Sequence, residues 1–261
     1  RARDTIANAA NKSRTRSEFA LASRASLCKV GPMISVVIPT LNAENGLVPT
    51  LAALVPATVD GLVREVIIAD GGSTDRTLDI VDAAGAAIVP SEPGRGNQLM
   101  AGAGKARFPW LLFLHADTVL ERGWHQEAAS FIERIEAGFR PPSAAAFRFA
   151  LDDRGIAPRV IETAVSLRCA LFRLPYGDQG LLIPARLYRE IGGYQPMPLM
   201  EDVDFARRLG RRRIVMLRSR AITSAARYRQ NGYGRRVARN LSCLTLYFLR
   251  VPIQKIARLY A

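Results

Sequence analysis

The feature that most constrains the fold is a regular alternation of short apolar runs and amphipathic stretches in the first half of the chain. The apolar runs predict strands at 34–38, 63–69, 86–89 and 110–114, and the stretches between them predict helices at 44–54, 74–84 and 96–106. Continuous apolar strands separated by helices are typical of a parallel sheet that is covered on both faces. Ligands of such sheets bind at the carboxyl ends of the strands, so functional residues are expected there.

The second half of the chain has a less regular pattern. It predicts a helix, a strand, a second helix and a short strand, in that order, over residues 124–135, 144–151, 156–172 and 181–183. A turn-rich loop precedes the last of these strands, and a loop rich in Pro and Gly, 192–199, leads into an acidic stretch. The acids of that stretch are expected to begin a helix that continues to Leu209.

Composition limits the class of protein. With 261 residues and 49% hydrophobic content, the chain is large enough for a domain with a real core. Its formal net charge of +14 favours anionic partners: nucleic acid, phosphorylated small molecules or an anionic membrane surface. The longest apolar run near the C-terminus has nine residues, whereas a membrane-spanning helix needs roughly 20. Without a secretory signal or a paired cysteine pattern, a cytoplasmic location is expected.

Three segments are expected along the chain. Residues 1–32 are rich in Arg, Ser and Ala and show no apolar period, which predicts a disordered basic leader. Residues 33–229 are expected to form the main domain. In residues 230–261, apolar side chains recur at helical spacing with Arg on the other side. This pattern predicts an amphipathic helical segment that packs on the domain, forms a dimer contact or lies at an anionic membrane surface.

Two polar motifs follow the first two predicted strands. In residues 39–44, PTLNAE, the Thr40 backbone and the Glu44 carboxylate suit a base or a ribose, and capping of the next helix is the alternative interpretation. Residues 70–75, DGGSTD, combine glycines that allow close backbone approach with Ser and Thr that suit a helix cap. Asp70 ends an apolar strand and has no structural role there unless a polar group lies opposite. A uracil-type N–H or a sugar hydroxyl would suit it.

Three further motifs carry charge. Arg95 lies near a predicted helix N-terminus, where it suits a diphosphate. Asp117 follows a buried strand and suits Mg²⁺ or Mn²⁺, which usually takes one or two carboxylates plus substrate phosphates. His115, two residues earlier, suits a phosphate or ribose. Glu201 and Asp202 suit a general base that takes a proton from an acceptor hydroxyl, although acids also stabilise the first turn of a helix.

Together these motifs resemble those of family 2 glycosyltransferases of the GT-A type, over residues 34–208. The matching residues are Pro39, Asn42, Glu44, Asp70, Gly71, Ser73, Asp75, the 115–117 triplet, Glu201 and Asp202. The stretches PGRGNQ at 93–98 and LFLHADT at 112–118 are similar to a narrower bacterial subgroup. The resemblance implies an α/β GT-A fold with a mostly parallel central sheet flanked by helices. It also implies an enzyme that moves a sugar from a nucleotide-diphosphate donor to an acceptor hydroxyl, with inversion at the anomeric carbon.

The resemblance implies a role for each matching residue. The nucleotide part of a UDP- or GDP-type donor is expected to contact Pro39, Thr40, Asn42, Glu44, Asp70, Gly71, Ser73, Arg95, Gln98, His115 and Ala116. Asp117 is expected to bind a divalent cation, Mg²⁺ or Mn²⁺, that bridges the donor diphosphate. Asp202 is the expected base, with Glu201 as its neighbour or substitute. The acceptor and donor-sugar side is expected to be lined by Gly177, Asp178 and Gln179.

The chain departs from the family pattern at the metal site. His115 replaces the first acid of the usual triplet, so the metal is expected to be held by one side chain. A C-terminal His ligand, seen in some GT-A enzymes, is excluded because the sequence has no His after His125.

The basic C-terminal third suggests the kind of acceptor. A helix at the inner face of a membrane would suit a lipid-linked acceptor, and peripheral membrane contact is therefore expected. No RNA- or DNA-binding signature accompanies the Arg residues, so nucleic acid is not an expected partner.

Two other functions compete with the transferase. A catalytically inactive relative would bind a nucleotide sugar as a sensor or scaffold, but every expected chemical position is filled. A sugar-phosphate nucleotidyltransferase would need a Gly-rich loop with Arg or Lys directly after the first strand, and residues 39–44 contain neither.

Overall fold

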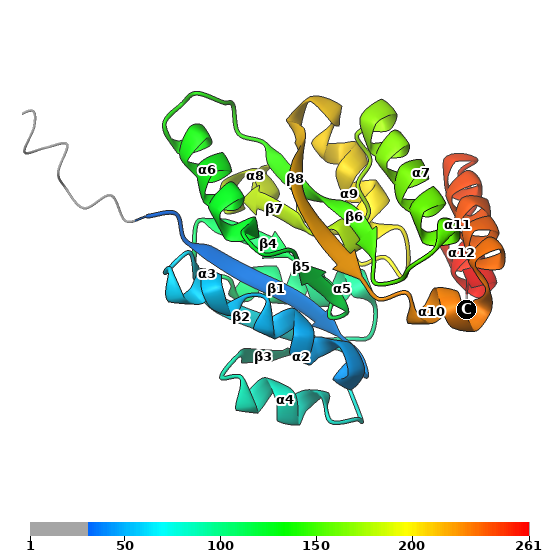
Figure 1. Ribbon diagram of the computed structural model, residues 1–261, viewed down its shortest axis with the longest axis horizontal. Helices are drawn as coiled ribbons and strands as arrows, with labels where there is room; N and C mark the ends of the chain where they lie inside the picture. Colours follow the sequence, from blue (N-terminus) through cyan, green and yellow to red (C-terminus); the bar gives the residue numbers. More distant parts are fainter. Residues whose placement is uncertain (1–30, 261) are drawn as a thin grey trace, which may run out of the picture. The chain divides into compact units, whose positions relative to one another are not determined.

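The structure is a computed structural model that describes residues 31–260, so the predicted leader lies outside the described residues apart from its last two positions. From Pro32 onward the described residues form one compact unit. Within it, a single sheet has eight strands in the order β3-β2-β1-β4-β7-β6-β8-β5 (Figure 1). The strands are β1 (Ile34–Thr40), β2 (Val63–Asp70), β3 (Ala87–Pro90), β4 (Trp110–Phe113), β5 (Thr118–Leu120), β6 (Ala144–Leu151), β7 (Leu181–Pro184) and β8 (Ile214–Thr223).

The predicted parallel sheet is confirmed for the first four strands along the chain. β1 pairs in parallel with β2 and with β4, and β2 pairs in parallel with β3. Every residue of β1 is buried, which explains its continuous apolar run. The register places Thr40 beside Asp70. The polar residues that end β1 and β2 therefore lie at one edge of the sheet.

The other half of the sheet is mixed. β7 is antiparallel to both β4 and β6, whereas β8 is parallel to β6 and antiparallel to β5. The sequence analysis assigned no strand to β5 or β8. In β8 the exposed Arg218 and Arg220 alternate with inward residues such as Leu217 and Ala221, so the charges obscure a period of two.

Helices cover both faces of the sheet. One layer, in contact with Val36 and Ile38 of β1, contains α2 (Glu44–Ala52), α3 (Val55–Val59) and α6 (Trp124–Glu136). The opposite layer, in contact with Val37, contains α5 (Arg95–Lys105), α8 (Ala185–Glu190) and α9 (Glu201–Leu209). The remaining elements in this part of the chain are α4 (Thr77–Ala83), α7 (Ile156–Phe172) and the short 3₁₀ turns η1 (Gly177–Gln179) and η2 (Arg211–Arg213).

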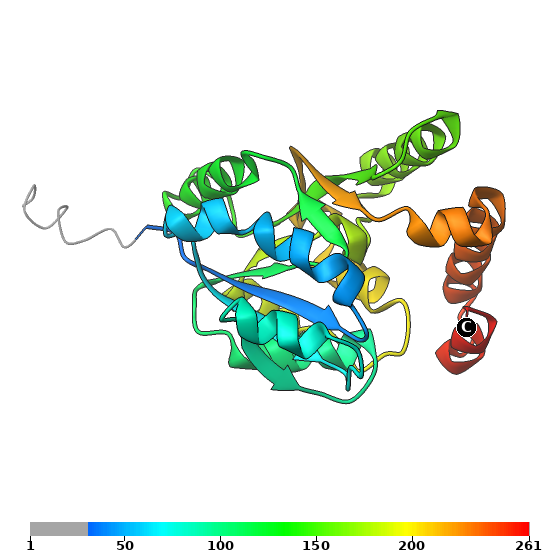
Figure 2. The same cartoon turned by 60° about the horizontal axis from the view of Figure 1, so that its bottom comes forward.

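Three helices follow β8: α10 (Ala226–Asn231), α11 (Tyr233–Phe248) and α12 (Ile253–Tyr260). α11 packs Leu244 and Tyr247 against the α5 layer of the core. Arg250, with φ of 61°, lies in the turn that separates α11 from α12, so the predicted helical segment is two helices. Figures 1 and 2 both place α7, α11 and α12 at the same end of the molecule. No helix in the described part of the chain has the length and hydropathy needed to cross a membrane.

Candidate functional site

The loops after β1 and β2 are joined by a reciprocal set of hydrogen bonds from Asn42, Glu44, Ser73 and Asp75, which we call the loop latch. The Asn42 N–H donates to Ser73 Oγ at 2.9 Å, and the Glu44 N–H donates to Asp75 Oδ2 at 3.1 Å. In return, the side-chain oxygens of Asn42 and Glu44 accept hydrogen bonds from backbone N–H groups of the second loop. The latch fixes the two strand ends relative to each other.

Asp70 is saturated by groups of its own chain. Its Oδ1 accepts from the hydroxyls of Thr40 and Ser73, and its Oδ2 accepts from the N–H groups of Gly72 and Ser73. Although burial alone would raise the pKa of Asp70, these hydrogen bonds hold it below its ordinary value. A carboxylate offers about four acceptor positions, and all of them are used here.

Gln98, on α5, links the ends of β1 and β2 through its side-chain amide. Its Nε2 donates to the backbone oxygens of Thr40 and Ala69, at 2.5 and 3.1 Å, and the side chain is buried. Gly71 lies against it, because a Cβ at that position would be 3.1 Å from Nε2 of Gln98. This edge of the sheet is therefore tightly fixed.

The 115–117 triplet lies directly after β4. α2 approaches it closely, because a Cβ on Gly46 would lie 3.0 Å from the Cα of Asp117. The backbone oxygen of Asp117 accepts a hydrogen bond from the N–H of Ser224. The backbone around Asp117 is thus held from two sides.

The imidazole of His115 is buried and has an unsatisfied nitrogen. Its buried Nε2 has no hydrogen-bond partner within the described residues. Burial, and then the positive charges of Arg95 and Arg227, hold the pKa of His115 well below its ordinary value. One nitrogen of a neutral imidazole is an acceptor and the other is a donor, so this side chain suits a ligand hydroxyl or phosphate oxygen.

The η1 turn brings a second set of groups against His115. The Gly177 N–H donates to Asp202 Oδ2 at 2.8 Å, and the Val203 N–H donates to Asp202 Oδ1 at 2.7 Å. A Cβ on Gly177 would lie 2.5 Å from Nε2 of His115 and 3.6 Å from Oδ2 of Asp202. Only glycine therefore fits between the side chains of His115 and Asp202. The carboxylate of Asp202 is therefore oriented by two backbone N–H groups.

Asp178, in the same turn, has a buried Oδ1 without a hydrogen-bond partner among the described residues. Burial raises its pKa to about 6; Asp202 and Asp117 add to this increase, and Arg168 and Arg95 oppose it. These interactions place Asp178 among the acids of the site. An unsatisfied buried carboxyl is costly unless a ligand uses it.

Glu201 begins α9 and is 1% exposed. Its Oε1 lies 3.6 Å from Nη1 of Arg95. Burial, and next the neighbouring Asp202, raise the pKa of Glu201 to about 7, while Arg95 opposes the increase. Met200, directly before it, has a left-handed backbone with φ of 64°. Such conformations are rare for residues other than Gly and are concentrated at functional sites.

A glycine lets the loop before α9 approach α5. A Cβ on Gly96 would lie 2.3 Å from the backbone oxygen of Gln195 and 2.9 Å from the backbone nitrogen of Met197. Gly96 follows Arg95 in the chain. This close contact is what brings Arg95 against Glu201.

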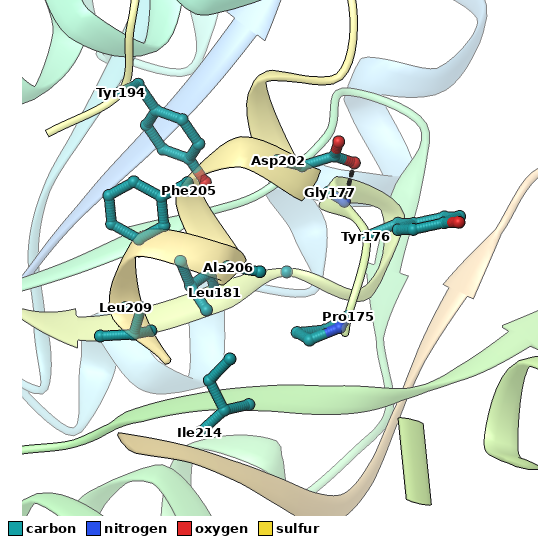
Figure 3. A pocket seen from close by; sticks show the side chains of 11 residues that line it. Pro175, Tyr176, Gly177, Leu181, Tyr194, Asp202, Phe205, Ala206, Leu209 and Ile214 are labelled. Carbon is teal, nitrogen blue, oxygen red and sulfur yellow. Dashed lines mark hydrogen bonds between the residues drawn. The ribbon is translucent and has the colours of Figure 1, made fainter. Parts of the chain in front are cut away.

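Two adjoining pockets share the lining residues Gly177, Leu181, Tyr194 and Asp202. His115 and Glu201 line one of them. The other is mainly apolar and is drawn in Figure 3, where Asp202 meets Gly177. Tyr194 and Phe205 stack there with ring centroids 4.5 Å apart. The site therefore combines acids, a guanidinium and an aromatic wall.

Comparison with protein families explains the strand-end motifs. Residues 35–153 match the family model of glycosyl transferase family 2. This part of the chain belongs to that family. The family 2 region contains the loop latch, Asp70, Arg95 and the 115–117 triplet, whereas η1 and α9 follow it in the chain.

Curated relatives that the chain matches are glycosyltransferases. Over 100 residues the chain is 36% identical to the glucosyl-3-phosphoglycerate synthase of Mycolicibacterium paratuberculosis, covering 35% of this chain and 30% of the relative. Over 119 residues it is 36% identical to a PGL/p-HBAD biosynthesis glycosyltransferase of Mycobacterium tuberculosis, covering 40% and 43%. The chain thus spans less than half the length of these relatives.

Solved structures share the fold. TarS 1-349 of S. aureus superposes with a TM-score of 0.55 at 19% identity, over 74% of this chain and 60% of that chain. The glucosyl-3-phosphoglycerate synthase of Mycobacterium tuberculosis superposes with a TM-score of 0.54 at 24% identity, over 86% and 82%. These likenesses confirm the predicted α/β fold of the GT-A type with its mostly parallel sheet.

The structure divides the predicted site residues into two groups. The first group, in and around the family 2 strand ends, is engaged in hydrogen bonds or buried in the chain itself: Pro39, Thr40, Asn42, Glu44, Asp70, Gly71, Ser73 and Gln98. The second group gathers around η1 and has unsatisfied or oriented polar atoms: Arg95, His115, Asp117, Gly177, Asp178, Glu201 and Asp202. Ala116 packs against the core.

The contacts of Asp70 and Gln179 differ from those of the other predicted site residues. Thr40 and Ser73 supply the polar groups opposite Asp70 that its position at the end of an apolar strand requires. Gln179 is 1% exposed, its Nε2 donates to the Phe147 backbone, and its Oε1 accepts from the Tyr176 N–H. Its amide is used entirely to hold the loop.

Sequence reasoning missed the groups that shape the second set. The Arg168 guanidinium lies 3.4 Å from the ring centroid of Tyr176 and donates to Gln179. One signal for it was present, because Arg168 lies directly before Cys169 in a mostly apolar stretch of the helix, residues 164–172. The contribution of Arg227 to the field at His115 had no such signal.

Proposed function

We propose that the protein transfers a sugar from a nucleotide-diphosphate donor to an acceptor hydroxyl, with inversion at the anomeric carbon. The observation that carries the proposal is the convergence of four carboxyl groups, a buried imidazole and a guanidinium around η1: Asp117, Asp178, Glu201, Asp202, His115 and Arg95. Burial, and then repulsion from neighbouring acids, raise the pKa values of Asp178 and Glu201, which favours a positively charged or hydrogen-bonding ligand. A donor diphosphate with its cation would supply both kinds of contact.

The donor would lie along the strand ends. The loop latch and Asp70 hold this edge rigidly, so the Thr40 and Gly71 backbone can present a fixed surface to a base and ribose. Arg95 is placed for the diphosphate, with Glu201 as its anchor. A glucosyl-3-phosphoglycerate synthase structure at 25% identity and a TM-score of 0.51 contains UDP, which supports a UDP-type donor over a GDP-type one.

The residues present fit a divalent cation shared with the donor. Among residues 31–260, no group of three or more His, Cys, Asp or Glu side chains is arranged to hold a metal ion. Mg²⁺ or Mn²⁺ bound through one or two carboxylates and substrate phosphates needs no such group. Asp117 and the unsatisfied Oδ1 of Asp178 would hold it. When bound, the cation stabilises the negative charge of the leaving diphosphate.

Asp202 is the proposed base. Its two backbone hydrogen bonds fix the carboxylate at the junction of the two pockets. There it would take the proton of the acceptor hydroxyl as the oxygen attacks the anomeric carbon and the nucleotide diphosphate leaves. Glu201 lies against Arg95, and we assign it the role of positioning that guanidinium. Tyr194 and Phe205 would exclude water from the apolar side.

The acceptor is proposed to be lipid-linked, with the enzyme in peripheral contact with the inner face of a membrane. Residues 226–260 support this proposal because they contain eight Arg or Lys and no Asp or Glu. The predicted apolar stripe of α11 is divided: Leu244 packs on the core, whereas Leu241 and Phe248 are more than half exposed. The exposed part of the stripe would face the membrane.

Calorimetry with UDP and GDP, with and without Mn²⁺, tests donor binding. We expect Mn²⁺-dependent binding of UDP that is lost in Asp117→Ala and retained in the control Asp79→Ala, whose side chain is 75% exposed. Asp202→Asn should keep this binding but lose transfer by about 10²- to 10⁴-fold, the usual contribution of a general base. Failure of every nucleotide diphosphate to bind would refute the proposal. Binding without transfer in the wild type would favour the inactive relative.

A further inference from the structure

α7 carries an apolar row that no other part of the described chain covers. Ile156, Val160, Leu167 and Leu171 are 84%, 60%, 58% and 52% exposed. Their spacing of four, seven and four residues places all four on one face of the helix. The opposite face packs Ile161 and Val165 against the core. The exposed row is therefore a second apolar face, separate from the one that anchors the helix to the domain.

The residues between these four on the outer face are also uncharged. They are Ala157, Thr163, Ala164 and Ala170, and all are exposed. The one acid of the helix, Glu162, is paired with Arg159 and accepts a hydrogen bond from the Leu151 N–H of β6. Arg154 and Arg173 flank the helix at its two ends. A wide uncharged row bounded by Arg is typical of helices that lie in the headgroup region of a membrane.

Charge complementarity identifies the occupant of this face. α7 lies at the same end of the molecule as α11 and α12 in both views (Figures 1 and 2). These two helices belong to the stretch of residues 226–260, which has eight basic residues and no acidic ones. A second copy of the chain would bring the same positive charge against this end, whereas an anionic lipid surface would neutralise it.

We propose that α7 inserts its apolar row into an anionic phospholipid surface, while α11 and α12 supply the electrostatic attraction. This assignment makes α7 the element that sets the orientation of the protein. Its end at Phe172 is followed four residues later by Tyr176 and the η1 turn, which carry the pocket. Given the proposed function, α7 thereby aims the acceptor side of the site at the bilayer.

Vesicle flotation without nucleotide tests the insertion. Wild-type protein should bind vesicles of phosphatidylcholine with phosphatidylglycerol, and bind phosphatidylcholine alone much more weakly. The double variant Val160→Ser, Leu167→Ser removes apolar area without adding charge, and should lower the partition coefficient by about 100-fold, about tenfold for each side chain. The matched control is Val59→Ser, Phe139→Ser, at positions that are 80% and 82% exposed outside α7, and it should bind like the wild type.

Three outcomes would overturn the proposal. The first is that the α7 variant and the wild type bind anionic vesicles equally. The second is that the wild type does not bind them. The third is a change from dimer to monomer in sedimentation of the α7 variant with vesicle binding unchanged, which would assign the row to a second copy. Donor hydrolysis in buffer should be the same in both double variants and in the wild type. If the wild type lacks hydrolysis but floats through α7, only the proposed function fails.

Discussion

Asp70, at the end of β2, and Asp178, in the η1 turn, are carboxyl groups in opposite environments. Asp70 accepts hydrogen bonds at both oxygens from its own chain, and these hold its pKa below the ordinary value. The Oδ1 of Asp178 has no partner among the described residues, and burial raises its pKa to about 6. The comparison separates two kinds of polar residue within one site: those that build the scaffold and those left available to a ligand.

The same contrast holds for the neighbours of each acid. Around Asp70, the loop latch and Gln98 leave few unsatisfied atoms. Around Asp178, by contrast, the nearby acids Asp117 and Asp202 raise its pKa further, and its Oδ1 has no partner among the described residues. These groups are left for a ligand to satisfy. Sequence motifs alone do not distinguish these two roles, because both acids fall in short polar segments, Asp70 at the end of β2 and Asp178 between α7 and β7. Their hydrogen bonds do distinguish them.

Exchanging the two acids for amides is the most direct way to break the comparison. Asp178→Asn should lower transfer by about 10²-fold, the cost of removing one preorganised electrostatic group, without lowering the free energy of unfolding. Asp70→Asn should lower the free energy of unfolding by about 3 kcal/mol, because one amide oxygen cannot replace two acceptors of charged hydrogen bonds. Urea unfolding and initial transfer rates check both. The distinction is wrong if Asp178→Asn destabilises the fold as much as Asp70→Asn.

A pair of glycines in α5 sharpens the comparison through the backbone. In Gly96→Ala the new Cβ would lie 2.3 Å from the Gln195 oxygen. The loop before α9 must then move, and Arg95 loses its position against Glu201. We expect a loss of about 1–3 kcal/mol in stability and about tenfold in transfer, since small misplacements at a site are costly.

The matched control is Gly104→Ala in the same helix. No atom lies within 4 Å of a Cβ at Gly104, so this change should stabilise the helix by about 0.5–1 kcal/mol and leave transfer unchanged. Thermal unfolding and transfer rates measure the pair. Equal rates in Gly96→Ala and Gly104→Ala would show that the contact of α5 with the loop before α9 does not position Arg95.

The parts of the fold that depend on local pattern were predictable from the sequence. β6 and α7 have the predicted bounds, and α9 begins at the predicted acid pair. β8 was not predictable because its exposed Arg218 and Arg220 make the pattern resemble a solvated basic stretch. The pairing of Arg95 with Glu201 was not predictable either. It depends on Gly96 meeting a loop about 100 residues away, and no sequence spacing encodes such a contact.

The same limit applies to the roles of the site residues. Sequence motifs identified Asp70 and Asp178 as polar strand-end or turn residues, but the difference between them lies in which atoms their neighbours donate. Thr40 on β1 donates to Asp70 on the neighbouring strand β2, and Arg168 on α7 donates to Gln179 in the η1 turn. Such contacts exist only once the chain has folded.

The pH dependence of stability provides the smallest and most specific test of the contrast. Glu201 and Asp178 have folded-state pKa values of about 7 and about 6, raised from 4.5 and 3.8. At a pH between its unfolded and folded values, each of these acids is ionised in the unfolded chain but still protonated in the folded chain. The free energy of unfolding therefore falls as pH rises and levels off above about pH 7. Asp70 has the opposite sign: its lowered pKa adds stability above pH 3.8, and that contribution is constant from pH 5 to 8.

Urea unfolding at pH 5 and pH 8 isolates this effect. The wild type should lose on the order of 4 kcal/mol more over this interval than the double variant Asp178→Asn, Glu201→Gln, in which the two groups no longer titrate. Asp79→Asn, an exposed acid outside the site, should behave like the wild type. If the double variant keeps the full loss, the two acids are not held protonated by their surroundings. In that case the acids of η1 and α9 would not have the raised pKa values that distinguish them from Asp70.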